Sequence, residues 1–133
     1  MFNESDVIHS YTRADAIADG TLFDASKVAR EAGFIIPVAL TQAVMIDCVL
    51  WPESVATRKP GTLQDEDGRL WDVLYMARLA VARAGDSQRV KYTIHRVPTE
   101  GTGVAPVEVT LVMHVGPGDR GEPVITIMQP NED

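Results

Sequence analysis

The segment PVALTQAVMIDCVLW, residues 37–51, is the longest nearly continuous apolar stretch of the chain. Only Thr41, Gln42 and Asp47 interrupt it, and at ~100° per residue these three do not share one helical face. A helix that is apolar nearly all round belongs in a protein core. Its fifteen residues are too few to cross a bilayer, which takes roughly 20. The segment therefore predicts a central buried helix bounded by two prolines.

Two short helices are predicted upstream of this segment. TRAD at residues 12–15 fits a capping box, in which a threonine and an acidic residue each bind the other's backbone N–H. That helix ends near Gly20, and a second helix, SKVAREAG at residues 26–33, ends at Gly33. Residues 1–10 are expected to form a loose arm. The prediction of both helices depends on capping residues that lie within or next to each helix.

A third type of pattern begins after the central segment. A long loop is predicted at residues 52–67, followed by the helix GRLWDVLYMARLAVARAG at residues 68–85, whose apolar residues recur at i, i+3, i+4 and i+7. Beyond it the period falls to two, which predicts strands at residues 89–97, 107–115 and 124–129. Loops rich in glycine and proline separate these strands.

The predicted fold is α+β in one domain of 133 residues. Residues 11–85 are expected to be helical, residues 88–129 to form an antiparallel three-stranded meander with one face on the helices, and residues 130–133 to fray. Matching the apolar faces of the first two strands predicts the pairs Val90–Val115, Tyr92–Met113 and Ile94–Leu111. Within the central helix, Met45, Ile46 and Val49 are expected to be almost fully buried.

Composition excludes several functional classes. The net charge of −7 argues against direct nucleic-acid binding, whose main contribution is neutralised phosphate. It would favour a partner with a basic surface, and the alternative is that the charge serves only to keep the protein soluble. The single cysteine, Cys48, forms no internal disulfide and suits a reducing compartment. There is no stretch typical of a signal peptide or a transmembrane helix. We therefore expect a cytoplasmic protein that does not contact the membrane.

The histidines and the cysteine do not combine into a predicted metal or nucleophilic site. The predicted register places His95 opposite Thr110 and His114 opposite Lys91, about 13 Å apart along the ladder. That separation is too long for a shared metal with bonds of ~2.0–2.1 Å. Cys48 is expected to be buried and unreactive. We expect no cofactor and no metal, and the sequence leans away from an enzyme.

The long predicted helix carries the best candidate for partner binding. Trp71, Tyr75 and Arg78 lie at i, i+4 and i+7, and interfaces are enriched in aromatic residues and arginine. The alternative is that the rings cover the edge of the core while the arginine extends to solvent. An acidic run precedes the helix, where its dipole favours negative charge. The predicted partner-binding residues are Asp65, Glu66, Asp67, Trp71, Tyr75 and Arg78.

Four stretches carry a resemblance to known sequences: YTRADAIADGTL (11–22), AREAGF (29–34), PVALT (37–41) and QDEDGRLWDVL (64–74). Together they resemble an uncharacterised family of unknown function that is common on bacterial plasmids and phages. Met45 departs from its pattern, because a tryptophan is expected shortly after PVALT. The family has no activity to carry over. The resemblance implies an accessory gene of a mobile element, and small acidic proteins of that context often inhibit host proteins, including CRISPR complexes.

Three functional hypotheses remain at this point. The first is a non-enzymatic accessory protein that binds a host protein and occludes its basic, nucleic-acid-binding site, as an anti-CRISPR-like inhibitor does. The second is a small enzyme with a pocket near Arg13, Asp15, Arg69 and Asp72. The third is a structural homodimer paired through an open strand edge.

Overall fold

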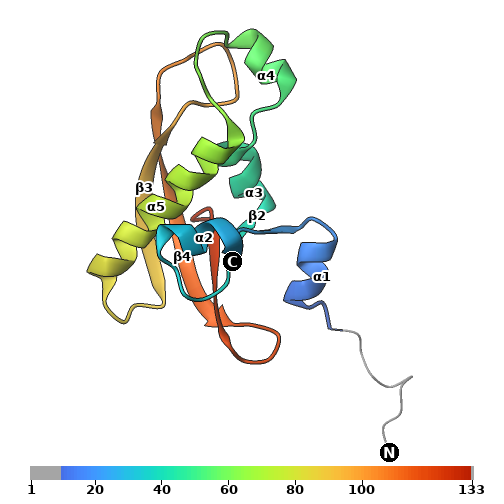
Figure 1. Cartoon of the computed structure of the whole chain (residues 1–133), viewed down its shortest axis with the longest axis vertical. Helices are drawn as coiled ribbons and strands as arrows, with labels where there is room; N and C mark the ends of the chain where they lie inside the picture. The colour runs from blue at the N-terminus through green and yellow to red at the C-terminus, as the bar shows by residue number, and fades with distance from the viewer. Residues whose placement is uncertain (1–9, 133) are drawn as a thin grey trace, which may run out of the picture.

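The computed structural model describes residues 10–132 and contains a five-stranded sheet with the helices Ser26–Ala32 and Glu66–Ala84 packed on one face, whereas the first helix lies to the side of the sheet (Figure 1). The α+β class is confirmed, whereas the expected loose arm falls almost entirely on residues 1–9, outside the described part. In chain order the elements are α1 (Arg13–Ala18), β1 (Leu22–Asp24), α2 (Ser26–Ala32), β2 (Val38–Thr41), α3 (Gln42–Val44), the π-helical turn η2 (Met45–Val49), α4 (Glu53–Arg58), α5 (Glu66–Ala84), β3 (Arg89–Arg96), β4 (Val107–Pro117) and β5 (Pro123–Met128).

The sheet is mixed, with strand order β1-β2-β5-β4-β3. As predicted, β3 pairs antiparallel with β4, and β4 pairs antiparallel with β5. The prediction of a three-stranded meander is nevertheless wrong, because β2 pairs parallel with β5 and β1 adds antiparallel to β2. The strand formed last along the chain, β5, therefore occupies the middle of the sheet.

The prediction of one buried helix over residues 37–51 is also wrong. Its first part forms β2, and the helical turns begin only at Gln42. A short apolar run fits a buried strand as well as a buried helix, and a parallel strand covered on both faces shows no alternation. Val38 and Leu40 in β2 are both 0% exposed. The switch to helix is made by Thr41, whose Oγ1 accepts a hydrogen bond from the N–H of Val44 at 3.3 Å.

The second part of the segment contains the π-helical turn η2. The N–H of Leu50 donates to the carbonyl of Met45 at 2.8 Å, a spacing of five residues. Val49 is buried as expected, but Met45 is only half-buried and Ile46 is 54% exposed. The prediction for Ile46 is wrong because η2 packs against the rest of the fold on one side and leaves its other side to solvent.

The β3–β4 register differs from the prediction by two residues. The observed pairs are Val90–Met113, Tyr92–Leu111 and Ile94–Val109. A shift of two keeps every side chain on its predicted face, so matching apolar faces cannot distinguish the two registers. His95 lies opposite Glu108 and His114 opposite Arg89, which separates the histidines by six ladder positions, about 20 Å.

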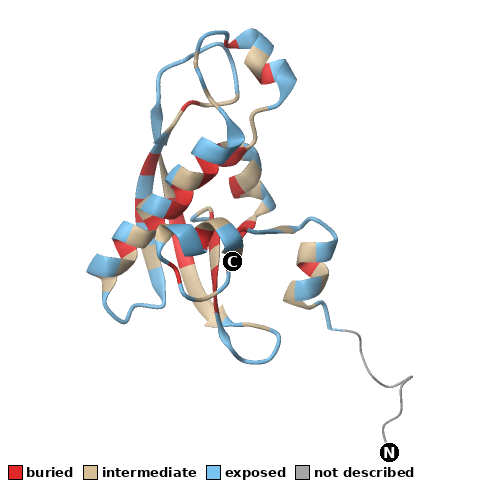
Figure 2. Ribbon diagram, viewed as in Figure 1, coloured by how far each residue is buried: buried red, intermediate tan, exposed pale blue. Residues whose placement is uncertain are grey.

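The core lies between α5, α2 and the facing side of the sheet, where Figure 2 shows the buried residues gathered. The helical spacing predicted for α5 is confirmed, since its buried apolar residues are Leu70, Val73, Leu74, Ala77 and Ala80. Tyr92 of β3 donates its hydroxyl to the carbonyl of Val73 at 3.1 Å and so ties the sheet to α5.

Two segments expected to be irregular have defined contacts. The predicted loop at residues 52–67 contains α4, which the sequence does not signal because only Val55 of that helix is buried. Glu132, in the tail expected to fray, accepts hydrogen bonds from Thr41 Oγ1 at 2.8 Å and from the N–H of Gln129 at 2.7 Å. That carboxylate folds the tail back against the end of β2.

Candidate functional site

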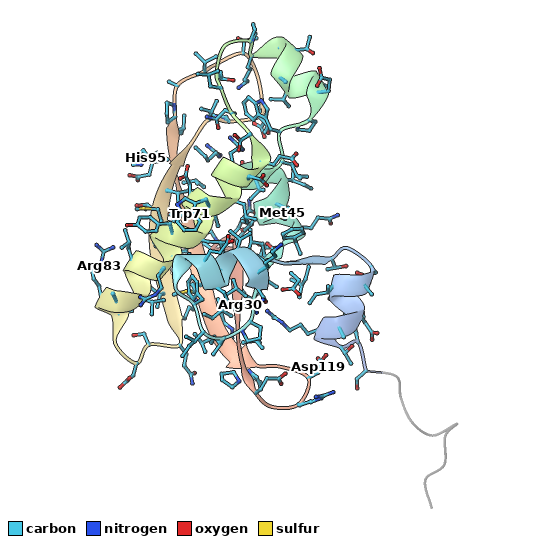
Figure 3. All side chains as sticks on the ribbon, in the orientation of Figure 1. Arg30, Met45, Trp71, Arg83, His95 and Asp119 are labelled. Atoms are coloured by element: carbon cyan, nitrogen blue, oxygen red, sulfur yellow. The ribbon has the colours of Figure 1, made fainter. Side chains whose placement is uncertain are left out.

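The solvent-facing side of α5 carries a row of three large side chains, of which Trp71 is half-buried and the other two are exposed. The rings of Trp71 and Tyr75 stack, with centroids 5.8 Å apart and planes at 16°. Tyr75 is 43% exposed, and Leu79, one turn further on, is 39% exposed. We call Trp71, Tyr75 and Leu79 the α5 stripe. Figure 3 shows Trp71 on the side of α5 turned away from the sheet. Leu79 was absent from the predicted site, although its spacing of i+8 from Trp71 marks the same face.

Arg78, predicted as part of this surface, is directed toward α2 instead. Its Nε donates to the carbonyl of Gly33 at 3.3 Å. Gly33 ends α2 in the left-handed conformation, with φ of 108°, and a Cβ at that position would lie 3.1 Å from Arg78 Nε. Glycine therefore serves both the backbone turn and the approach of the arginine.

Two of the three predicted acidic residues stabilise the start of α5. Asp65 Oδ1 accepts the N–H of Gly68 at 2.6 Å as the N-cap, and Glu66 Oε2 accepts the N–H of Trp51 at 2.9 Å. Asp67 is exposed on the first turn. Its charge is therefore the cleanest one to remove when testing electrostatic attraction of a partner.

The four residues of the enzyme hypothesis occupy two separate places. Arg13 on α1 donates to Thr126 Oγ1 at 2.8 Å and to the carbonyl of Ile125 at 2.7 Å, at the β5 strand. Asp15 forms the predicted capping box with Thr12. Arg69 and Asp72, both on α5, line a small polar cavity of about 170 Å³ together with Cys48, Gln64, His95 and Arg96. The cavity that holds Arg69 and Asp72 therefore contains neither Arg13 nor Asp15.

Arg69, which lines that cavity, is buried and connects three segments through hydrogen bonds. It is 5% exposed, and its guanidinium donates to the carbonyls of Val49 at 3.1 Å and Val97 at 3.0 Å and to Gln64 Oε1 at 2.8 Å. The Trp51 ring lies 4.8 Å from its central carbon. Loss of water lowers the pKa of Arg69 from its usual value. Its contacts tie η2, the loop before α5 and the end of β3 together.

The thiol in the same cavity is chemically quiet. Burial and, to a smaller extent, the neighbouring carboxylate of Asp47 raise the pKa of Cys48 to about 12. Arg96 neutralises that carboxylate with Nη2–oxygen distances of 2.9 and 3.2 Å. Burial also raises the pKa of Asp72. The cavity thus holds a protonated thiol rather than a thiolate nucleophile.

Native Cys48 should react slowly with a thiol reagent at neutral pH, because it is 1% exposed and its thiol stays protonated. Addition of urea to a concentration that unfolds the chain should raise the rate of labelling by orders of magnitude. The measurement is the rate of absorbance change with a chromogenic disulfide. Labelling of the folded chain at the rate of a free thiol would reinstate Cys48 as a nucleophile.

A buried lysine is a feature that the sequence did not indicate. Lys59 is 1% exposed, and its Nζ donates to the carbonyls of Pro98, Glu100 and Gly103. Three carbonyls satisfy the three N–H groups of an ammonium. Loss of hydration lowers the pKa of Lys59, and nearby arginines lower it further. This side chain fastens the β3–β4 loop to the end of α4.

Comparison with known proteins places the chain in a family without assigning a function. Within residues 10–132 no group of three or more histidine, cysteine, aspartate or glutamate side chains is placed to hold a metal ion. Over the same part of the chain, no helix has the length and apolar character needed to cross a membrane. Curated proteins and solved structures gave no match. One family matches over residues 1–133, and the chain belongs to it: the family of unknown function DUF6573.

Proposed function

We propose that this protein acts by binding another protein through the α5 stripe. The supporting observation is the stacked Trp71–Tyr75 pair, continued by Leu79, on the solvent side of the longest helix. Aromatic side chains supply most of the binding energy at protein interfaces, and neighbouring apolar side chains exclude water around them. Two rings already stacked lose little conformational freedom on binding.

The proposed partner is a cytoplasmic host protein with a basic surface. The net charge of −7, and Asp67 close to the α5 stripe, favour encounter with such a surface. A bound chain of this size would occlude a nucleic-acid-binding groove by steric and charge effects. In this proposal the protein is an accessory product of a mobile genetic element, and inhibition of a CRISPR-like defence complex is the form of counter-defence that fits the resemblance.

The test begins with affinity purification from a bacterial host lysate and continues with the purified partner. The double variant Tyr75→Ala/Leu79→Ala should dissociate at least about tenfold faster than the wild type, because the anchor is removed. Both side chains are partly exposed, so the fold should be retained. The matched control is Lys91→Ala on the exposed position of β3. Biolayer interferometry measures the rates, and equal dissociation of the two variants would refute the assignment of the surface.

Asp67→Asn should slow association and leave dissociation unchanged, because an exposed charge mainly attracts the partner over a distance. The difference from wild type should vanish at about 1 M salt, where the screening length is about 3 Å. The two variants separate attraction from anchoring. An effect of Asp67→Asn that persists at high salt would show direct contact rather than long-range attraction.

A homodimer paired through the β3 edge of the sheet is less well supported than the α5 stripe. β3 is an edge strand, and the side chains of Arg89, Lys91 and His95 point to its exposed face. In a two-fold antiparallel pair of β3 strands these basic side chains would face those of the second copy. Like charges opposite each other are unfavourable, and a charged edge strand is typical of protection against such pairing.

A further inference from the structure

A cavity of about 400 Å³ lies between the C-terminal half of α5, the loop after α2 and the facing side of the sheet. Its volume falls in the range of small-molecule pockets, roughly 300–1,000 Å³. Nine of its thirteen lining residues carry apolar side chains, among them Val81, Val115 and Ile125. The walls therefore suit the apolar body of a ligand.

The charged part of the cavity lining is positive only. Arg78 is the one charged residue in the lining, which contains no carboxylate, and Ser87 adds a hydroxyl group. The bond from Arg78 Nε to the Gly33 carbonyl fixes the direction of the guanidinium. Within residues 10–132, the hydrogen bonds and ion pairs of the structure leave both Nη atoms of Arg78 without a partner. A planar guanidinium fork oriented in this way matches a carboxylate.

The loop residue Ile35 marks the mouth of the cavity. It lines the cavity and is 95% exposed, whereas its neighbour Phe34 is 6% exposed and belongs to the core. An isoleucine this exposed beside an apolar cavity is positioned to be covered when a ligand enters. The apolar lining therefore extends from the buried core to the protein surface.

We propose that this cavity binds an amphipathic monocarboxylate. Its apolar body lies against Val81, Val115 and Ile125, and its carboxylate binds the Nη atoms of Arg78. One arginine and no acid favour a single negative charge over a cationic head group, which would lack a counter-ion there. This site is distinct from the α5 stripe, so the inference goes beyond the proposed protein-binding function and does not depend on it.

Isothermal titration calorimetry of the full chain with decanoate tests the proposal, with decyltrimethylammonium as the ligand of equal chain length and opposite charge. Decanoate should bind with a stoichiometry of one, and the ammonium compound at least about tenfold more weakly. Arg78→Gln should weaken decanoate binding by about tenfold to a hundredfold, the range expected for hydrogen bonds to a charged group. Arg83→Gln, on the same helix and outside the cavity lining, is the matched control and should bind like the wild type.

Two further variants locate the ligand and guard against misfolding. Ala84→Leu adds volume at the cavity wall and should weaken decanoate binding while leaving Arg78 in place. Arg78→Lys keeps the charge without the fork, so it should retain the preference for carboxylate over ammonium at reduced affinity. Thermal unfolding of each variant establishes that it is folded. The proposal is overturned if decanoate shows no saturable binding, if the ammonium compound binds equally well, or if folded Arg78→Gln and Ala84→Leu bind decanoate as the wild type does.

Discussion

Leu40→Ala should lower the free energy of unfolding by about 2–5 kcal/mol, the range measured for large-to-small substitutions in protein cores. Leu40 is 0% exposed in β2, paired with Phe23 of β1 on one side and with Ile127 of β5 on the other. The surrounding strands cannot collapse onto the space that the side chain leaves, because their hydrogen bonds hold them apart. Urea unfolding followed by tryptophan fluorescence measures the loss.

The matched control lies six residues further along the same apolar segment. Ile46 is 54% exposed on η2, so Ile46→Ala should change the free energy of unfolding by less than about 1 kcal/mol. The pair of variants separates the strand-and-turn structure from a continuous buried helix. Equal, large losses at Leu40 and Ile46 would contradict the observed division of the segment.

Arg69→Met should lower the free energy of unfolding by about 3–5 kcal/mol. Methionine keeps much of the apolar stem but leaves the carbonyls of Val49 and Val97 without donors, and each buried polar group that loses its partner costs about 1–3 kcal/mol. The stacking of the guanidinium on Trp51 is lost as well. The same urea titration provides the value.

Arg83→Met on the exposed last turn of α5 controls for the loss of a positive charge from that helix. It should change stability by no more than about 0.5 kcal/mol. If Arg69→Met were as mild as Arg83→Met, the carbonyls around Arg69 would have to find other donors, and its role as a brace between η2 and the end of β3 would be refuted.

Local signals predicted α1, α2 and α5 well, but not the division of residues 37–51 or the helix α4. The capping box of α1, the glycine that ends α2 and the apolar spacing of α5 each depend on residues within a few positions of one another. The same holds for the alternation in β3 and β4. What failed was non-local: the pairing of β2 with β5 joins segments more than eighty residues apart, and neither strand alone specifies its neighbour.

The candidate site shows the same division. The helical spacing of Trp71 and Tyr75 predicts that they share one face, and in the structure their rings are stacked. The contacts of Arg78 with Gly33 and of Glu66 with Trp51 were missed because each joins α5 to a residue outside that helix, and helical spacing does not specify such a partner. The apolar cavity was missed because its walls come from the loop after α2, the end of α5 and the three strands β3, β4 and β5, which lie far apart in the sequence.

The central position of β5 has a consequence for synthesis of the protein. Ribosomes make β1 and β2 early, yet β2 gains its second neighbour only when residues 125–127 have been added, near the end of the chain. Until then the N–H and C=O groups along one edge of β2 have no partner among the strands already made, and contacts between distant segments form slowly. A chain whose synthesis has not yet reached β5, or stops before it, therefore exposes an unpaired strand edge, so avoidance of aggregation requires translation to continue through β5.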